Sequence, residues 1–366
     1  MSDRVLGAPA PAPVAGVVAS PGARAPLAAP QYRGALIGFG GVARDSHVPG
    51  AASSPALRER LAIVVAVDPA PDAASATDIP VIAHRDGLGN FGAIDFVDVC
   101  TPTALHVSTT LWALEQGFHV LCEKPVAATR ADAAAISAAA RRKKRVVLPC
   151  HQHRFNPAWQ QMHRWLRDGA IGTWHLAELS VYRPAADAGR DRTGRPWRTG
   201  SDDGAIGGGI LLDHGTHLLY SLFDAAGTMP QAVRAYTGRL RHHAYAVEDT
   251  AHLLLEFPDR LATISLTWAA PHRENRVRFI GTEGLIDWQG GVLRLERAAK
   301  APEVLDFSAQ LDKRSYAGWF GRLFEQFVGA LDDGAAPDAL AEIERVARVL
   351  EAAQAAAASG ARTQII

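Results

Sequence analysis

The chain has 366 residues, of which 48% are hydrophobic and 21% charged, and its formal net charge is zero. This composition is typical of a globular protein, and the length allows about two domains. Since the chain has no basic excess, we expect neither nucleic acid nor a membrane surface as a partner, and a small molecule is favoured.

The terminal segment and the cysteines bear on location. Residues 1–32 contain 15 Ala or Pro residues and no pattern of a signal peptide, which predicts a disordered tail. No apolar stretch reaches the roughly 20 residues that span a bilayer. Cys100, Cys122 and Cys150 each end an apolar run and form no CxxC pair. Buried thiols of this kind predict a reducing, cytoplasmic location.

Short apolar runs alternate with helical patterns between residues 33 and 150, which we interpret as a dinucleotide-binding domain. The expected strands cover 35–39, 61–67, 81–83, 96–100, 120–122 and 146–148. The expected helices begin near Val42, cover 103–116, and run from a Thr129 cap to about Lys143. Such alternation predicts an α/β fold with a doubly wound parallel sheet.

The pattern changes in residues 151–366, which we interpret as a second α/β domain. Helices are expected at 158–167, 211–223, 318–331 and 339–358, and a polar loop at 183–207. Strands are expected at 175–182, 232–240, 250–257, 262–268, 277–280 and 292–295. Their short connections predict an open, mainly antiparallel sheet with helices on one side.

A glycine-rich turn after the first strand predicts a dinucleotide site. It comprises Gly38, Phe39, Gly40, Gly41, Val42 and Ala43. The first glycine permits a tight turn, the second lets the backbone approach a pyrophosphate, and the small Ala43 lets the helix pack on the strand. Asp68 ends the second strand, where a carboxylate accepts hydrogen bonds from ribose hydroxyls and repels a 2′-phosphate. NAD is therefore favoured over NADP, unless a base such as Arg85 compensates.

Two further strand ends supply candidates on the ligand edge of this sheet. Thr101 and Pro102 would meet the nicotinamide ribose, and His106 either contacts the cofactor or packs in its helix. Glu123, Lys124 and Pro125 follow the fifth strand. The Lys124 ammonium can polarise a substrate oxygen, while Glu123 anchors the nicotinamide side or orients Lys124. A simple surface turn is the alternative.

Asp213 and His217 lie four residues apart in a predicted helix that follows Gly207, Gly208 and Gly209. At this spacing they share a helix face. We expect Asp213 to orient His217, and the His217 imidazole to titrate near neutrality as a general base. The alternative is a polar pair that only stabilises the helix.

Polar side chains near these groups are candidates for binding a polyol, whose hydroxyls need hydrogen-bond partners. They are His151, His153, Arg154, Asn156, Trp197, Arg198 and His214. Arg154 and Asn156 have a structural alternative, as braces of the domain crossover. A zinc site formed by His151, His153, Asp213, His214 and His217 would instead favour a hydrolase or lyase, but it leaves the glycine turn and Lys124 unexplained, so no metal is expected.

Together these motifs resemble the glucose–fructose oxidoreductase/inositol dehydrogenase family (Gfo/Idh/MocA) from about Arg33 to the C-terminus. The resemblance also rests on Arg154-Phe155-Asn156-Pro157 and Gly281-Thr282-Glu283-Gly284. It implies a Rossmann domain, a second domain whose open sheet often serves oligomerisation, and Lys124, Asp213 and His217 as catalytic residues. It further implies NAD or NADP and a sugar, sugar derivative or cyclitol as substrate.

The resulting hypothesis is NAD-dependent oxidation of a secondary alcohol on a sugar, glycoside or cyclitol by a homo-oligomer, a dimer or tetramer. His217 would take the hydroxyl proton and Lys124 would polarise the same oxygen, while the hydride passes to nicotinamide. Two alternatives stay open: a redox-neutral epimerase or glycoside-cleaving enzyme that forms a transient keto sugar, and a non-catalytic NAD-binding regulator.

Overall fold

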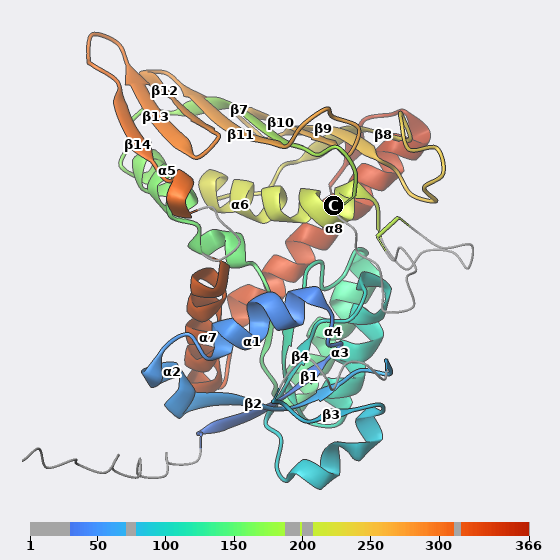
Figure 1. Ribbon diagram of the computed structural model, residues 1–366. Helices are drawn as coiled ribbons and strands as arrows, with labels where there is room; N and C mark the ends of the chain where they lie inside the picture. The colour runs from blue at the N-terminus through green and yellow to red at the C-terminus, as the bar shows by residue number, and fades with distance from the viewer. Residues whose placement is uncertain (1–29, 71–77, 187–197, 200–207, 311–315, 366) are drawn as a thin grey trace, which may run out of the picture.

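The computed structural model describes residues 30–70, 78–186, 198–199, 208–310 and 316–365. Two sheets lie at opposite ends of the molecule and helices fill the space between them (Figure 1). Residues 1–29 of the predicted tail at 1–32 lie outside the described residues, as do the candidates Trp197 and Gly207, whereas Tyr32 already belongs to a strand.

The first sheet is parallel and six-stranded, with the order β3-β2-β1-β4-β5-β6. Its strands are β1 (Tyr32–Ile37), β2 (Leu61–Val67), β3 (Val81–Ile82), β4 (Phe96–Val99), β5 (His119–Cys122) and β6 (Val147–Pro149). The order reverses between β1 and β4, which is where such sheets bind ligands at the carboxyl ends of their strands. The predicted doubly wound sheet is confirmed.

Helices cover both faces of this sheet. They are α1 (Val48–Ala51), α2 (Pro55–Arg60), α3 (His106–Glu115) and α4 (Arg130–Lys143), with short turns η3 (Arg85–Phe91) and η4 (Thr103–Leu105). The helix expected from Val42 begins instead as a π-helical turn, η1 (Ala43–His47), and α2 was not predicted. Thr129 caps α4 as predicted, because its side chain accepts the Asp132 N–H.

The second sheet has nine strands in the order β14-β13-β12-β11-β7-β10-β9-β8-β15. Neighbouring strands pair antiparallel except for β7 and β10, which are parallel. The strands are β7 (Trp174–Tyr182), β8 (Ala232–Gly238), β9 (Thr250–Glu256), β10 (Leu261–Thr267), β11 (Glu274–Gly281), β12 (Gly284–Gln289), β13 (Val292–Arg297), β14 (Glu303–Asp306) and β15 (Thr363–Gln364). The mainly antiparallel sheet is confirmed, although β12, β14 and β15 were not predicted.

Helices cover one face of the second sheet and leave the other face open (Figure 1). They are η5 (Gln152–Phe155), α5 (Pro157–Arg167), η6 (Leu211–Gly215), α6 (Thr216–Ala226) and α8 (Pro337–Ser359). The helix α7 (Tyr316–Asp333) packs instead on the first sheet, where Phe320, Phe324 and Phe327 share a core with Phe96 and Leu121. The C-terminal helices therefore bind the two parts of the molecule together, while the boundary near residue 150 stays a prediction.

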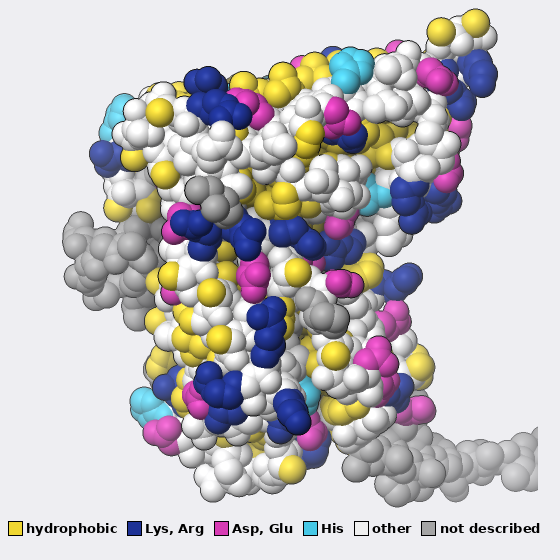
Figure 2. Space-filling view, turned by 180° about the vertical axis from the view of Figure 1, so that it is seen from behind, with side chains coloured by type: hydrophobic (Ala, Val, Ile, Leu, Met, Phe, Trp, Pro, Cys, Tyr) yellow, Lys and Arg dark blue, Asp and Glu magenta, His cyan; other side chains and the backbone are white. Residues whose placement is uncertain are grey.

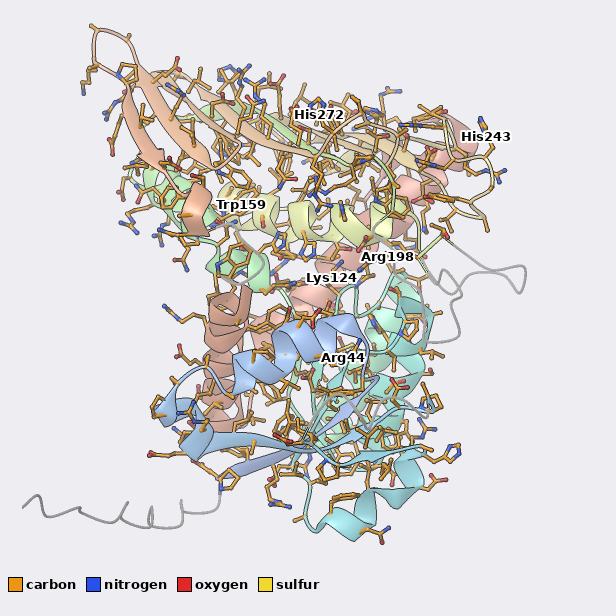
Figure 3. All side chains as sticks on the ribbon, in the orientation of Figure 1. Arg44, Lys124, Trp159, Arg198, His243 and His272 are labelled. Carbon is orange, nitrogen blue, oxygen red and sulfur yellow. The ribbon has the colours of Figure 1, made fainter. Side chains whose placement is uncertain are left out.

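This arrangement brings the carboxyl ends of β4 and β5 opposite η6 and α6, and Figure 3 shows Lys124 and Arg198 between them. Acidic and basic side chains are interspersed on the face in Figure 2. Within the described ranges, every helix is too short or too polar to cross a membrane.

Candidate active site

The glycine turn after β1 has the shape that a bound pyrophosphate requires. Gly38 adopts φ +91°, and a Cβ there would lie 2.7 Å from the backbone of Cys100, so only glycine fits without strain. At Gly40, by contrast, a Cβ would meet no atom within 4 Å. The backbone at Gly40 is therefore open to a ligand at the start of the η1–α1 helical segment, where free N–H groups favour phosphate.

Asp68 lies at this turn, as predicted. Its Oδ2 accepts the Phe39 N–H at 2.8 Å and its Oδ1 accepts the Ala70 N–H at 2.9 Å. Phe39 is 1% exposed and belongs to the core. The predicted contact from Phe39 is therefore corrected: its N–H binds Asp68 and its side chain is buried. Val42 is exposed, and a Cβ at Gly41 would meet only Asp45 Oδ2, at 3.9 Å, so the contact of Gly40, Gly41 and Val42 with the cofactor stays a prediction.

His106 links the two loops that follow β4 and β5. Its Nε2 lies 2.8 Å from the Thr101 carbonyl oxygen and its Nδ1 lies 2.8 Å from the Pro125 carbonyl oxygen. The ring is 2% exposed, so it serves as a link between loops rather than the predicted cofactor contact. Thr101 Oγ1, in contrast, is buried without a hydrogen-bond partner among the described residues. That orphaned hydroxyl, the open Gly40 and Asp68 fit a dinucleotide.

Glu123 is part of a buried triad with two residues that the sequence did not single out. His47 Nδ1 lies 2.8 Å from Asp98 Oδ2, and His47 Nε2 lies 3.1 Å from Glu123 Oε1. Burial opposes the charged ring, but the adjacent Asp98 carboxylate holds the pKa of His47 well above its ordinary value. Glu123 Oε2 accepts the Lys124 N–H at 3.0 Å. Glu123 therefore orients the Lys124 backbone, which is one of its two predicted roles, instead of anchoring the nicotinamide.

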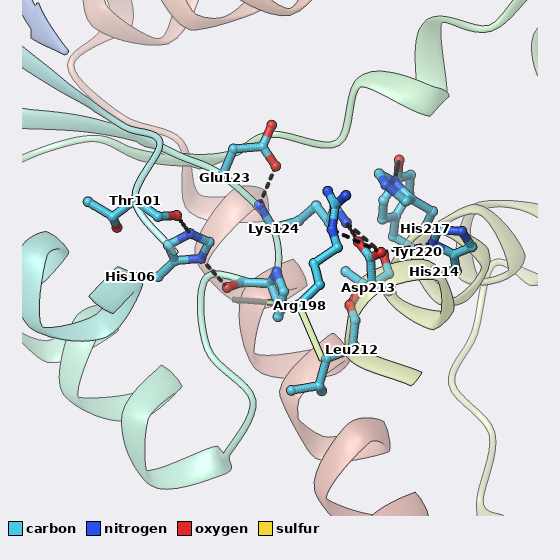
Figure 4. A network of polar contacts seen from close by, with 12 residues as sticks. Thr101, His106, Glu123, Lys124, Arg198, Leu212, Asp213, His214, His217 and Tyr220 are labelled. Carbon is cyan, nitrogen blue, oxygen red and sulfur yellow. Dashed lines mark hydrogen bonds and ion pairs between the residues drawn. The ribbon is translucent and has the colours of Figure 1, made fainter. Parts of the chain in front are cut away.

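Lys124 reaches across to the second domain (Figure 4). Its Nζ donates to Asp213 Oδ1 at 2.9 Å and to the Asp213 carbonyl oxygen at 2.6 Å. Arg198 Nε and His214 Nδ1 lie 3.4 and 3.3 Å from Asp213 Oδ2. Burial alone would raise the pKa of Asp213. The positive charges of Lys124 and Arg198 outweigh burial and hold the pKa well below its ordinary value. Asp213 is thus an anion surrounded by donors.

His217 has a different partner from the one predicted. Its Nδ1 lies 2.9 Å from Tyr220 Oη, and its ring stacks on His153 with centroids 3.9 Å apart and planes 8° apart. The prediction that Asp213 orients His217 is corrected, because the Asp213 carboxylate binds Lys124, Arg198 and His214. The reason lies in the partners: the Asp213 carboxylate has Lys124 and Arg198 beside it, and a carboxylate binds a cationic donor more strongly than a neutral imidazole.

The expectation that His217 titrates near neutrality is also wrong. Burial, and then the neighbouring His153 and Lys124, place the pKa of His217 well below its ordinary value, although Asp213 opposes them. Burial and Lys124 likewise lower the pKa of His153, to about 3. Both imidazoles are therefore neutral at pH 7. A neutral ring offers one nitrogen lone pair, which is what a proton acceptor needs.

The substrate candidates divide into two groups. His153, Arg198 and His214 join the network of Lys124, Asp213 and His217. The other candidates have structural partners: Arg154 binds Asp224 and Glu342, His151 Nδ1 binds Glu342 at 2.8 Å, and Asn156 caps α5. Arg154, His151 and Asn156 are therefore corrected from substrate contacts to structural residues, since His151 and Arg154 link the segment around η5 to α6 and α8 and Asn156 caps α5. Trp197 lies outside the described residues.

The predicted alternative of a zinc site finds no support in this arrangement. His153 and His217 are stacked in parallel, whereas ligand lone pairs lie in the ring planes and must converge on one ion. Within the described ranges, His47, Asp98 and Cys150 form the only group of three close ligand atoms. Both nitrogens of His47 already face carboxylates there.

Sequence reasoning missed Tyr220, His47 and Asp98. Tyr220 lies three residues after His217, a spacing that places both on one helix face. His47 lies one helical turn after the glycine turn, and Asp98 lies inside β4, where a buried carboxylate needs a partner. Tyr220 could be found from its helical spacing to His217, and Asp98 from its charge within an apolar strand. No local pattern pairs Asp98 with His47.

Family models match most of the described core. Residues 32–151 match "Oxidoreductase family, NAD-binding Rossmann fold", and residues 159–287 match "GFO/IDH/MocA C-terminal domain". D-glucoside 3-dehydrogenase of Escherichia coli is 32% identical over 178 residues, covering 44% of this chain and 48% of that protein. The scyllo-inositol 2-dehydrogenase (NADP(+)) of Bacillus subtilis is 26% identical over 297 residues, covering 75% of this chain and 80% of that protein.

A solved structure of levoglucosan dehydrogenase, in complex with NADH and levoglucosan, shares the fold with a TM-score of 0.76. It is 20% identical, and the match covers 91% of this chain and 99% of that one. The two matched ranges cover the parallel sheet and the part of the second sheet from β7 to β12. The chain belongs to the Gfo/Idh/MocA family of NAD-binding oxidoreductases.

Proposed function

We propose that this enzyme oxidises a secondary hydroxyl of a sugar, glycoside or cyclitol with NAD. One observation carries the proposal: Lys124, from the end of a Rossmann strand, binds Asp213 one turn before His217 in the second domain. An amine and a neutral imidazole therefore flank the carboxyl edge of the sheet, where such folds bind ligands. The named activities of the relatives, on a glucoside, an inositol and levoglucosan, support this substrate class.

Each residue has a defined task in this proposal. His217 accepts the hydroxyl proton at its free ring nitrogen. Lys124 donates a hydrogen bond to the same oxygen and stabilises its developing negative charge. Asp213 keeps the Lys124 ammonium in place, and Arg198 and His214 offer further donors to a polyol. Neutral His217 beside cationic Lys124 lets one group accept a proton while the other stabilises charge, as an alcohol oxidation requires.

The dinucleotide would be held by the backbone at Gly38 and at Gly40–Val42, by Asp68 and by the Thr101 hydroxyl, and bound nicotinamide supplies the hydride acceptor. We choose NAD over NADP because the Asp68 carboxylate lies at the glycine turn, where it accepts from ribose hydroxyls and repels a 2′-phosphate. One relative is named for NADP(+), so both cofactors belong in the test.

The decisive experiment is a cofactor-reduction screen. Purified enzyme is incubated with NAD or NADP and with neutral sugars, glycosides, inositols and sugar acids, and the oxidised carbon is identified by NMR. Lys124→Ala and His217→Ala should each lower turnover by roughly 10²–10⁴ and keep NAD affinity. Exposed Lys300 and His272 supply matched controls, Lys300→Ala and His272→Ala. Normal turnover in either site variant removes that residue from the mechanism.

The two alternative functions give different results in the same screen. A redox-neutral epimerase or glycoside-cleaving enzyme would convert a sugar without net NADH, and NMR would show an epimer or a cleaved glycoside. A non-catalytic regulator would bind NAD and convert nothing. The Lys124, Asp213 and His217 set favours catalysis, because a protein that only binds NAD needs no group for proton transfer.

We further propose a homo-oligomer formed through the open face of the second sheet. Tyr236 and Leu261 are 49% and 42% exposed there, and a groove on this face is lined by Arg234, Tyr236, His252, Leu254, Thr263 and Ser265. Light scattering of the wild type and of Leu261→Asp would test this.

The three cysteines are buried free thiols, which supports our placement of the enzyme in the reducing cytoplasm.

A further inference from the structure

The residue that orients His217 is Tyr220. We infer that Tyr220 Oη accepts a hydrogen bond from His217 Nδ1–H and so leaves His217 Nε2 as the proton acceptor, an inference that rests on the proposed role of His217. The two atoms are 2.9 Å apart and the rings meet edge to face, at 74°. Figure 4 shows His217 and Tyr220 together, beyond Asp213 as seen from Glu123.

Several contacts fix the position of the Tyr220 side chain. It is 0% exposed, and its ring stacks on His151 with centroids 3.9 Å and planes 17° apart. His151 is in turn fixed by Glu342 of α8 at 2.8 Å. The Tyr220 hydroxyl also accepts the His153 backbone N–H at 3.2 Å. Its position is therefore set by three segments of the chain.

The ring of His217 is fixed by two contacts that do different things. The His153 ring lies parallel to it at 3.9 Å, which fixes its plane. Tyr220 fixes its rotation within that plane, because one ring nitrogen must face Oη. A histidine that accepts a proton at Nε2 must carry hydrogen on Nδ1, and that hydrogen needs an acceptor. Tyr220 Oη is placed to be that acceptor, the role that the sequence predicted for Asp213.

Other charged or titratable groups near the imidazole act on its charge. His153, Lys124 and His214 disfavour the imidazolium, and Asp213 favours it. Tyr220 differs from all of these because it is a neutral group in direct contact with Nδ1. Its loss should therefore change the position and the tautomer of His217 more than the charge of the site.

The test compares Tyr220→Phe with the wild type. Phenylalanine keeps the ring on His151 and removes only the hydroxyl. We expect kcat to fall roughly 10- to 100-fold, with KM and NAD affinity within about twofold of wild type. Ser221→Ala is the matched control, because Ser221 Oγ is also buried on α6 and has no hydrogen-bond partner among the described residues. That control should keep its kcat.

A tautomer measurement separates this inference from the proposed function. In enzyme with ¹⁵N-labelled histidine, two-bond ¹H–¹⁵N spectra should show a protonated Nδ1 and an unprotonated Nε2 for His217, with His217→Ala assigning the signals. Tyr220→Phe should mix the two tautomers while thermal melting confirms folding. A wild-type ring protonated on Nε2, with Tyr220 as donor, overturns the inference, as does normal kcat in Tyr220→Phe. Normal turnover in His217→Ala instead overturns the proposed function.

Discussion

Replacing His47 by leucine should expose how much the buried triad contributes to stability. His47 and Asp98 are both 0% exposed, and Glu123 is 6% exposed. Leucine fills a similar volume but leaves both carboxylates without their shared cation. Removing one partner of a buried ion pair costs about 3–5 kcal/mol. Two hydrogen bonds to charged groups, at about 1.5–3 kcal/mol each, give a similar loss.

The effect should depend on pH in a defined direction. Because the folded pKa of His47 is raised, its contribution is complete below the unfolded pKa of about 6.5. Above that pH the unfolded ring loses its proton while the folded ring keeps it. Stability then falls by about 1.4 kcal/mol per pH unit until the pH passes the folded pKa. The difference between wild type and His47→Leu should therefore be largest near pH 6 and shrink toward pH 9.

Urea unfolding followed by tryptophan fluorescence and circular dichroism at several pH values would measure both effects. Exposed His84 provides the control variant His84→Leu, which should unfold like the wild type. The explanation is refuted if His47→Leu loses less than about 1 kcal/mol near pH 6, or if its deficit stays constant between pH 6 and pH 9. Either result would mean that the triad is neutral or already solvated.

Two further predictions concern the cofactor site. Gly40→Ala should keep the melting temperature, because its methyl group enters only open space. It should weaken NAD binding in calorimetry, because the methyl group occupies the space proposed for the pyrophosphate. Gly38→Ala should also destabilise the fold, since φ +91° costs an L-residue about 1–2 kcal/mol and its methyl group would clash with Cys100. Asp68→Asn should weaken NAD more than NADP, and an equal change in the two dissociation constants would disprove its contact with the ribose.

The sequence determined the parts of this protein that depend on local pattern. Alternating apolar runs predicted all six strands of the first sheet and six of the nine strands of the second, and the spacing of glycines identified the turn at Gly38. Strand-end motifs placed Thr101 and Lys124 at the ligand edge, because the carboxyl ends of parallel strands meet there. Strands β14 and β15 were missed because they are short edge strands, whose pattern is too brief to be periodic.

The tertiary structure decided which side chains meet. Lys124 and Asp213 are 89 residues apart in sequence, and no local pattern pairs them. The Asp213 carboxylate contacts Lys124, Arg198 and His214, whereas His217 contacts Tyr220 and His153. Burial then moved the pKa of His217 downward, since removal from water disfavours the imidazolium. Sequence motifs can thus identify candidate reactive residues, whereas tertiary packing determines which side chains they contact and what their pKa values are.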